Sequence, residues 1–275
     1  MVIFPNCKIN LGLNIIRKRE DSYHDLETIF YPLDICDALE IITSNDTQPV
    51  QFSFSGSDIN DIGQDNLCIK AYKLLKKDFP KLPSVKMHLH KAIPVGAGLG
   101  GGSADAAFTL TLLNHKFQLN LSTNQLTSYA SKLGSDCAFF IINKPCFAQG
   151  RGEILQPVNL NLSSYKFLIV NPGIHISTAW AFSKIQPAAP PQSLLQIIEQ
   201  PLETWKDSLT NDFEKPLMQY YPQLKLLKED LYKIGALYAG MSGSGSTFFG
   251  IYPKTKEIDT NIFPQDYFVK LVNGL

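Results

Sequence analysis

The segment 94–103, Pro-Val-Gly-Ala-Gly-Leu-Gly-Gly-Gly-Ser, constrains this chain more than any other, because it places five glycines within ten residues. Glycine has no Cβ and accepts positive φ angles, so a run of glycines lets successive backbone N–H groups converge on an anion. The residues that follow, 104–113, favour a helix, and a helix N-terminus attracts negative charge. The segment therefore predicts a phosphate-binding loop at the start of a helix, where Ser103 either caps the helix or contacts a metal ion.

Three known phosphate-binding patterns do not fit the surrounding residues. Three of the glycines match G-x-G-x-x-G, but a dinucleotide-binding fold needs an acidic residue about 20 positions later, and none lies between Asp105 and Asp136. The Walker pattern needs a lysine directly before the hydroxyl residue, whereas glycine precedes Ser103. The protein-kinase motifs H-R-D and D-F-G do not occur. A lysine at the phosphates must come from elsewhere in the chain, and a loop without a ligand is the alternative interpretation.

Composition narrows the classes of partner. The 275 residues are 44% hydrophobic and 18% charged, with 25 Lys and Arg against 25 Asp and Glu. Without net positive charge we expect no nucleic acid or membrane partner, and a chain of this length favours about two domains. The five cysteines contain no C-x-x-C pair, which argues against a disulfide framework and a zinc site. With no basic leader and no apolar run near ~20 residues, we expect a cytoplasmic protein.

The segment 8–15 predicts a strand with a polar face. Apolar residues there alternate with Lys8, Asn10, Gly12 and Asn14, a period of two that is typical of a strand with one buried face. Asparagine is disfavoured in strands. The polar face is therefore either a solvated edge or a binding surface.

The rest of the chain predicts a mixture of strands and helices. Apolar segments at 26–33, 38–43 and 50–54 favour an antiparallel meander. Asp136 stands before the apolar run 137–142, either as a turn or cap residue or as a group tuned for chemistry. We further expect helices over 66–78, 123–133, 193–199 and 213–233, strands over 85–90, 165–170 and 247–252, a hairpin turn at 150–152 and a stiff loop at 187–191. The glycine-serine loop at 240–246 either approaches a ligand or another chain segment, or is a plain hairpin with a wide turn.

Several of these segments together carry a resemblance to a known family. They are Pro5–Leu11, Tyr23–His24, Pro94–Ser103, Leu133–Asp136, Asn211–Glu214 and Met241–Phe248. In them the chain resembles the GHMP small-molecule kinases, named for galactokinase, homoserine kinase, mevalonate kinase and phosphomevalonate kinase. The resemblance covers essentially the whole chain in order. It departs at Cys7, where the family usually has Ala, and at Ser22, where it usually has Gly.

The resemblance implies a fold and an activity. The fold is α+β with two domains, an ATP-binding N-terminal domain similar to ribosomal-protein domain 2 over 1–155 and a ferredoxin-like C-terminal domain on the substrate side over 156–275, with the active site in the cleft between them. The implied reaction is ATP-dependent phosphorylation of an alcohol, most closely the 2-hydroxyl of a cytidine-diphosphate-linked methylerythritol in the non-mevalonate route to isoprenoid precursors. Mg²⁺ is expected beside ATP, and the protein is expected to be a monomer or a weak homodimer. The alternatives are a homoserine- or mevalonate-type kinase and a nucleotide- or RNA-binding module that kept the fold without catalysis.

The resemblance also assigns roles to residues of this chain. It makes Asp136 the general base, and Lys8 the group that orients Asp136 and stabilises charge on the accepting oxygen. Ser103 is the nearest candidate ligand for Mg²⁺, and Asp105 either contributes to that ion or caps the helix. The implied ATP-binding residues are Pro94, Val95, Gly96, Ala97, Gly98, Leu99, Gly100, Gly101, Gly102, Ser103 and Ala104, with Asn66, Lys91 and Asn114 around the adenosine. The implied substrate-binding residues are Asn10, Tyr23, His24, Thr178 and Phe182, with the rings of Tyr23 and Phe182 on the two faces of cytosine.

Overall fold

The computed structural model describes residues 1–56 and 66–274, and the chain divides into two compact units. The first unit comprises residues 1–7, 35–95 and 100–144, and the second comprises 8–34, 96–99 and the chain from 145 onward. The units interleave along the sequence, whereas the division implied by the resemblance, 1–155 and 156–275, is contiguous. That contiguous division stays a prediction.

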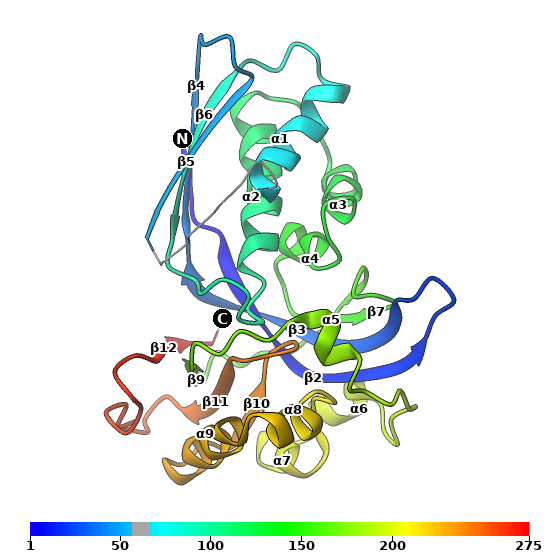
Figure 1. Ribbon diagram of the computed structural model, residues 1–275, viewed down its shortest axis with the longest axis vertical. Coiled ribbons are helices and arrows are strands. Elements are labelled where there is room, and N and C mark those ends of the chain that lie inside the picture. Colours follow the sequence, from blue (N-terminus) through cyan, green and yellow to red (C-terminus); the bar gives the residue numbers. More distant parts are fainter. Residues whose placement is uncertain (57–65, 275) are drawn as a thin grey trace. The chain divides into compact units, whose positions relative to one another are not determined.

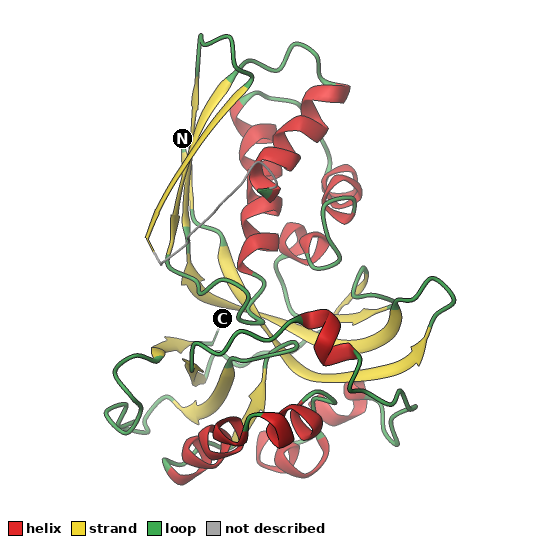
Figure 2. Cartoon of the chain, in the orientation of Figure 1, coloured by secondary structure: helices red, strands yellow, loops and turns green. Residues whose placement is uncertain are grey.

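The first unit is built on a four-stranded sheet with helices on one side (Figures 1 and 2). The strand order is β1 (Val2–Ile3), β4 (Ala38–Thr43), β6 (Val85–Lys91) and β5 (Val50–Gly56). Strand β5 pairs with β6 in parallel, and the other pairs are antiparallel. The expected antiparallel meander is therefore wrong, because segment 26–33 belongs to another sheet and segment 50–54 pairs with a strand that comes after a helix.

Four helices cover this sheet, and local capping signals set where two of them begin. They are α1 (Leu67–Asp78), α2 (Gly101–Lys116), α3 (Thr123–Ser131) and α4 (Cys137–Ile142). The side chain of Asn66 accepts a hydrogen bond from the N–H of Cys68, and Ser122 and Gln125 form the reciprocal capping box. Both predicted helix starts are confirmed at these residues, although the suggested cap Asp65 lies outside the described residues. The helix expected to reach 133 ends at Ser131.

A hydrophobic core joins the helices of the first unit to its sheet. Strand β6 alternates buried and more exposed positions, as the sequence predicts. Its buried side chains pack with those of α1 and α2 in one cluster, which includes Tyr72, Leu75, Met87, Leu89 and Leu110. This core fixes where β6 ends and where α2 begins, on either side of the glycine-rich loop.

The second unit contains most of another sheet, whose two long strands are the curved blue ribbons of Figure 1. The strand order is β2 (Asn6–Lys18), β3 (His24–Cys36), β7 (Cys146–Gln149) and β8 (Ile154–Pro157). Strands β7 and β8 pair antiparallel around residues 150–152, which confirms the predicted hairpin. Strand β2 is buried on both faces from Asn6 to Ile15, so the solvated-edge interpretation of its polar face is wrong.

The other sheet of the second unit has the strand order of a ferredoxin-like fold. The strands β9 (Tyr165–Asn171), β10 (Tyr238–Met241), β11 (Phe248–Pro253) and β12 (Phe268–Asn273) are antiparallel in the order β10, β11, β9, β12. Numbered along the chain, this is 2-3-1-4, the order of the β-α-β-β-α-β motif. The described residues between β11 and β12 contain no helix, so the second helical connection of that motif is replaced by a loop.

The helices between β9 and β10 are short. They are α5 (Thr178–Phe182), α6 (Leu194–Ile198), α7 (Trp205–Ser208), α8 (Glu214–Tyr220) and α9 (Pro222–Lys233), with a 3₁₀ turn at Leu202–Thr204. The helix expected over 213–233 is interrupted at Tyr221, whose φ is −129°. Proline disfavours the helical conformation in the residue before it, so Pro222 starts a new helix instead of continuing α8.

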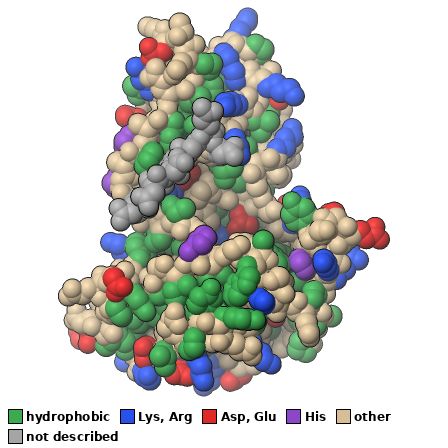
Figure 3. Space-filling view, viewed as in Figure 1, with side chains coloured by type: hydrophobic (Ala, Val, Ile, Leu, Met, Phe, Trp, Pro, Cys, Tyr) green, Lys and Arg blue, Asp and Glu red, His purple; other side chains and the backbone are tan. Residues whose placement is uncertain are grey.

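Helices α8 and α9 pack on the β9–β12 sheet through a core that includes Leu168, Leu217, Leu224, Leu227 and Phe248. Basic and acidic side chains both appear on the face shown in Figure 3, in line with their equal numbers in the sequence. Within residues 1–56 and 66–274, no helix combines the length and the apolar character that crossing a bilayer requires.

Candidate active site

The glycine-rich loop takes up left-handed backbone conformations at alternate positions. The φ angles of Gly96, Gly98 and Gly100 are 67°, 80° and 72°. Gly100 is the N-cap of α2, and no side chain caps this helix. The N–H groups of residues 101–103 accordingly have no hydrogen-bond partner among the described residues. The loop and helix start thus offer uncapped donors to an anion, and the interpretation of Ser103 as a helix cap is wrong.

A second loop of small residues packs directly against the first. The Ser242 hydroxyl donates to the carbonyl oxygen of Gly98 at 2.8 Å. A Cβ on Gly98 would lie 2.1 Å from the carbonyl oxygen of Ser242, so only glycine fits there. A Cβ on Gly243 would lie 3.3 Å from the Cα of Gly98. The glycine-serine loop 240–246 therefore approaches another chain segment, as expected. It also connects the antiparallel strands β10 and β11, so the hairpin expectation is confirmed as well.

Lys8 lies beside this glycine loop, on the polar face of β2. Only 3% of the residue is exposed. Its Nζ donates to the Asn10 Oδ1 at 2.6 Å and contacts the Gly98 carbonyl oxygen at 3.4 Å, and it lies 4.8 Å from the centre of the Phe30 ring. Lys8 is thus a buried ammonium next to the loop that lacks a lysine of its own, and its role at the phosphates stays a prediction.

Asn10 is held in place by further buried hydrogen bonds. Its Nδ2 donates to the Thr28 hydroxyl at 2.9 Å, and Thr28 donates to the carbonyl oxygen of Gly12 at 2.6 Å. The Ser242 hydroxyl lies 3.4 Å from Asn10 Oδ1. Thr28 and Ser242 carry no local sequence signal, because their partners are 18 and 232 residues away along the chain. This network fixes the Asn10 oxygen that accepts from Lys8.

Asp136 lies in the first unit, directly before α4. The residue is half-buried and occupies the N-cap position of α4 in a turn, as the turn-or-cap interpretation predicts, although its side chain makes no capping hydrogen bond. The neighbouring Cys137 thiol is buried, which raises its pKa to about 12, and it is hydrogen-bonded to the side chain of Ser103 in the first turn of α2. The first unit therefore brings the segment of Asp136 to the uncapped end of α2.

A buried charge cluster lies under the same end of α2. Lys91 Nζ, from a residue only 4% exposed, bonds to carboxylate oxygens of Asp37 and, at 2.7 Å, of Asp105. The other Asp37 oxygen accepts from the N–H groups of Ala92 and Ile93 at 2.6 and 2.9 Å. The cluster ties the end of β6, where the glycine-rich segment begins, to helix α2.

The cluster holds two carboxylates for one ammonium. The Oδ1 of Asp105 is buried without a hydrogen-bond partner among the described residues. Burial, opposed only in part by Lys91, raises the pKa of the Asp105 carboxyl to about 7. Asp105 lies beyond the first turn of α2 and does not cap it. Sequence reasoning missed Asp37, whose partner Lys91 is 54 residues away.

The residues expected around the adenosine all bond to their own chain. Asn66 caps α1, and Lys91 is ion-paired with Asp37 and Asp105. The Asn114 side chain donates to the carbonyl oxygen of Leu121 at 3.1 Å and accepts from its N–H at 2.9 Å. Their contacts with ATP stay a prediction.

Two of the residues expected at the substrate base stack on each other, while the placement of cytosine between Tyr23 and Phe182 stays a prediction. Phe182 stacks on His24, with ring centres 4.8 Å apart and planes at 17°, and packs edge-on against Phe213. Burial lowers the pKa of His24, and the charge of Lys18 adds to this effect. Tyr23 is 55% exposed and has the Arg151 guanidinium over its ring. In this structure the ring on the face of Phe182 is thus His24.

Two further observations concern the substrate residues. Thr178 begins α5, and its hydroxyl lies 3.2 Å from that of Ser244 in the glycine-serine loop. Ser22, where the resembling family usually has Gly, has a φ of 67°. The turn before Tyr23 therefore keeps the left-handed conformation that glycine takes without strain.

The described residues contain no group of three or more His, Cys, Asp or Glu side chains that would hold a metal ion. A Mg²⁺ ion bound through phosphates and water needs few protein ligands. The Ser103 side chain, in the first turn of α2, fits such a minor role. Asp105 does not fit it, because its charge is already paired with Lys91.

Comparison with known proteins shows relatives that match most of this chain. Family models described as GHMP kinases N terminal domain and GHMP kinases C terminal match residues 66–144 and 193–260. A 4-diphosphocytidyl-2-C-methyl-D-erythritol kinase of Bacteroides fragilis strain YCH46 is 52% identical over 259 residues, covering 94% of each chain. A crystal structure of 4-(cytidine 5'-diphospho)-2C-methyl-D-erythritol kinase superposes with a TM-score of 0.79 at 28% identity over 100% of both chains.

The fold extends to more distant proteins. A Methanococcus jannaschii mevalonate kinase superposes with a TM-score of 0.74 at 14% identity, over 100% of this chain and 98% of that one. This likeness concerns the fold alone. The family models and the close relative go further: this chain belongs to the GHMP kinase family, with that family's two-domain fold of mixed helices and sheets.

Proposed function

We propose that this protein transfers the γ-phosphoryl group of ATP to the 2-hydroxyl of 4-diphosphocytidyl-2-C-methyl-D-erythritol. The observation that carries the proposal is the 52% identity, over 94% of both chains, to a relative named as the kinase of this compound. Phosphoryl transfer needs mainly positioning and charge neutralisation. The uncapped start of α2 and the buried Lys8 beside the glycine loop support such a role.

In the proposed mechanism Asp136 accepts the proton of the substrate hydroxyl as its oxygen attacks the γ-phosphorus. The new O–P bond forms while the bond between the γ-phosphorus and the bridging oxygen breaks, and ADP leaves with that electron pair. Lys8 stabilises negative charge on the reacting oxygens and orients Asp136. A buried ammonium fixed by Asn10 suits this role, because charge interactions are stronger away from water and need no rearrangement.

We propose that the backbone of residues 94–104 holds the ATP phosphates. Mg²⁺ neutralises phosphate charge when bound, and Ser103 is its proposed protein ligand. Asn66, Lys91 and Asn114 are proposed to shape the adenosine site through the segments that they fix. The contiguous division at residue 155 belongs to the same proposal, with ATP bound by the N-terminal part.

For the substrate we propose Asn10, Tyr23, His24, Thr178 and Phe182. The stack of Phe182 and His24 offers an aromatic surface of the kind on which a planar base packs. Asn10 presents its amide beside Lys8. We also propose that the protein is a cytoplasmic monomer or weak homodimer without nucleic acid or membrane partners. Size-exclusion chromatography with light scattering tests the proposed oligomeric state.

The test is ADP release from ATP with three acceptors: 4-diphosphocytidyl-2-C-methyl-D-erythritol, homoserine and mevalonate. We expect turnover with the first alone. Phosphorylation of homoserine or mevalonate instead would assign the chain to another alcohol kinase of the family. No ADP release with any acceptor would favour a binding module without catalysis.

The role of Asp136 has its own test. Asp136→Asn should lower kcat by about 10² to 10⁴, the range for a positioned general base, and leave binding of ATP and substrate within a few-fold. Asp266→Asn, at an exposed position of the second unit, is the matched control and should keep the parent turnover. Parent-level turnover in Asp136→Asn would remove this residue from the mechanism.

A further inference from the structure

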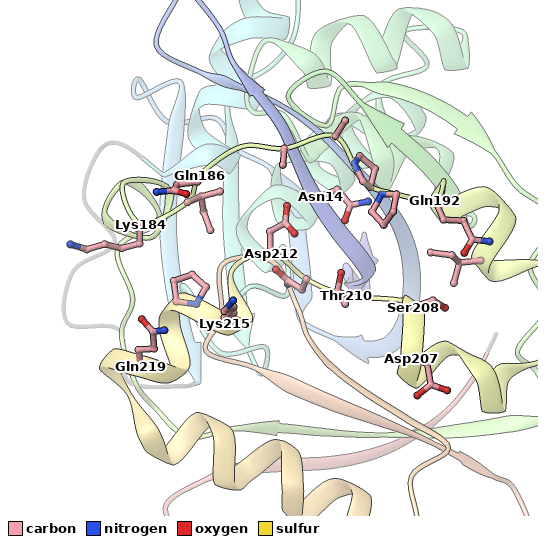
Figure 4. A pocket seen from close by; sticks show the side chains of 18 residues that line it. Asn14, Lys184, Gln186, Gln192, Asp207, Ser208, Thr210, Asp212, Lys215 and Gln219 are labelled. Carbon is pink, nitrogen blue, oxygen red and sulfur yellow. The ribbon is translucent and has the colours of Figure 1, made fainter.

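The second unit contains a cavity of about 890 Å³ that the proposed kinase mechanism does not use (Figure 4). Its wall is made by β2, by the loop that follows α5, and by the connection between α7 and α8. None of the residues assigned above to ATP, substrate or catalysis is among the described residues that line it. The cavity is large enough for a small organic ligand.

Asn14 is the unusual residue of this cavity. It is only 5% exposed, and no hydrogen bond joins its carboxamide to the other described residues, although its amide atoms are not fully closed off from the cavity. Asn211 lines the same cavity and shows the contrast, since its Nδ2 donates to two backbone carbonyl oxygens and its Oδ1 accepts from the N–H of Phe213. Buried amides are normally hydrogen-bonded, so the amide of Asn14, which its own chain leaves unpaired at the cavity wall, is available to a ligand there.

Asp212 supplies an acceptor next to Asn14. Its Oδ2 accepts from the N–H of Ile15 at 2.7 Å, while its Oδ1 has no hydrogen bond and its carboxylate no ion pair among the described residues. Burial raises the pKa of this carboxyl above its usual value. Backbone hydrogen bonds between Leu13 and residues 210 and 212 fix the two segments together. Figure 4 shows Asn14 and Asp212 adjacent in the lining.

The surrounding residues add apolar walls and positive charge. Pro190 and Pro191 line the cavity, and their loop is tied to β2 by a hydrogen bond from the N–H of Ala188 to the carbonyl oxygen of Ile15 at 3.0 Å. Lys215 lies to one side of the Asn14–Asp212 pair in Figure 4, whereas Lys184 lies farther away and its Nζ is over the rings of Trp180 and Tyr220. Rigid proline faces suit a planar ring, and ammonium groups suit a phosphate.

We propose that this cavity binds a nucleotide whose base carries an amino group beside a ring nitrogen, as cytosine and adenine do. Asp212 accepts a hydrogen bond from the amino group, and the Asn14 amide donates to the ring nitrogen. Carboxylates and carboxamides read these groups on bases in protein–nucleic acid contacts. The prolines cover the ring, and Lys215 attracts the phosphate. This site is separate from the residues proposed for phosphoryl transfer.

Calorimetric titration of the full chain with four nucleotides tests the base preference. In UMP and IMP a carbonyl oxygen replaces the amino group of CMP and AMP, and that oxygen faces the Asp212 carboxylate unfavourably. We expect CMP, AMP or both to bind at least about tenfold more tightly than their carbonyl counterparts. Preference confined to CMP identifies cytosine as the base, and preference confined to AMP identifies adenine.

Two variants separate this site from nucleotide binding elsewhere in the protein. Asp212→Asn presents an amide N–H₂ to the base and should shift the preference toward UMP or IMP, a change that misfolding does not produce. Lys215→Gln, at an exposed position, should weaken binding of the nucleotide but not of the nucleoside. Neither variant should change the affinity of a nucleotide that is bound by the glycine-rich loop. The test therefore remains valid even if the protein proves to have no kinase activity. Equal binding of amino and carbonyl bases by the parent protein, or an unchanged preference in Asp212→Asn, would overturn the proposal.

Discussion

Replacement of Lys91 by methionine tests whether the charge cluster under α2 holds the glycine-rich segment in place. The substitution removes the ammonium that pairs with Asp37 and Asp105 and leaves two buried carboxylates. Removing one partner of a buried ion pair costs about 3–5 kcal/mol of unfolding free energy. At about 2–4 °C per kcal/mol for chains of this size class, the melting temperature should fall by roughly 6–20 °C.

A matched control lies on the same strand. Lys86 also pairs with an aspartate, Asp46, but both side chains are more than 40% exposed. An exposed pair contributes about 0–1 kcal/mol, so Lys86→Met should melt within a few degrees of the parent protein. The measurement is thermal unfolding followed by circular dichroism. Equal melting temperatures for the two variants would refute the reasoning, because burial would then make no difference.

The same cluster predicts a pH dependence. The pKa of Asp105 is about 7 in the folded protein against about 3.9 in an unfolded chain, so the folded state binds this proton more tightly. The associated stability is present below about pH 4 and is lost as pH rises toward 7, with a slope of up to about 1.4 kcal/mol per pH unit. Asp105→Asn lacks this proton. In urea unfolding between pH 4.5 and 7.5, the unfolding free energy of the parent minus that of the variant should therefore fall as pH rises, and a constant difference would contradict the assignment.

Three further substitutions test other parts of the structure. Gly98→Ala should destabilise the protein by several kcal/mol in urea unfolding, because its Cβ would lie 2.1 Å from the Ser242 carbonyl oxygen at a φ of 80°; parent-level stability would mean that the two loops move apart easily. Ser22→Gly should raise the unfolding free energy by about 1 kcal/mol, since φ is 67° there, and a loss would show that the hydroxyl makes a needed contact. Phe182→Ala should raise KM for the cytidine-bearing substrate and leave KM for ATP unchanged; an equal rise in both would make the ring a packing residue.

Features with local causes were predictable from the sequence. The capping residues Asn66 and Ser122 begin helices where expected, because a cap needs only neighbours two or three residues away. The helix after the glycine-rich segment was predictable because the residues that follow this segment favour a helix by themselves. The hairpin at 150–152 also depends on adjacent residues alone.

Features that depend on distant partners were not predictable. The expected meander failed because β5 pairs in parallel with β6 across an intervening helix, which strand length and spacing do not reveal. From its place near a helix start, Asp105 is predicted to cap the helix or to contact Mg²⁺. Its side chain instead bonds to Lys91, which also contacts Asp37, a residue that lies 54 positions before Lys91. The alternation in the sequence predicts the polar face of β2. Its burial depends on contacts with Thr28 and Ser242, which no local sequence pattern predicts.

The interleaving of the two units has a consequence for how such a gene can be divided. The polypeptide passes from one unit to the other after residues 7, 34, 95, 99 and 144. A single cut, or a single recombination point, cannot separate the units: a cut after residue 144, for example, leaves most of β2 and β3 of the second unit on the fragment that carries the first. Neither unit can then be inherited or exchanged as a contiguous cassette, and a chimaera with a related kinase would need matched exchanges at all of these junctions.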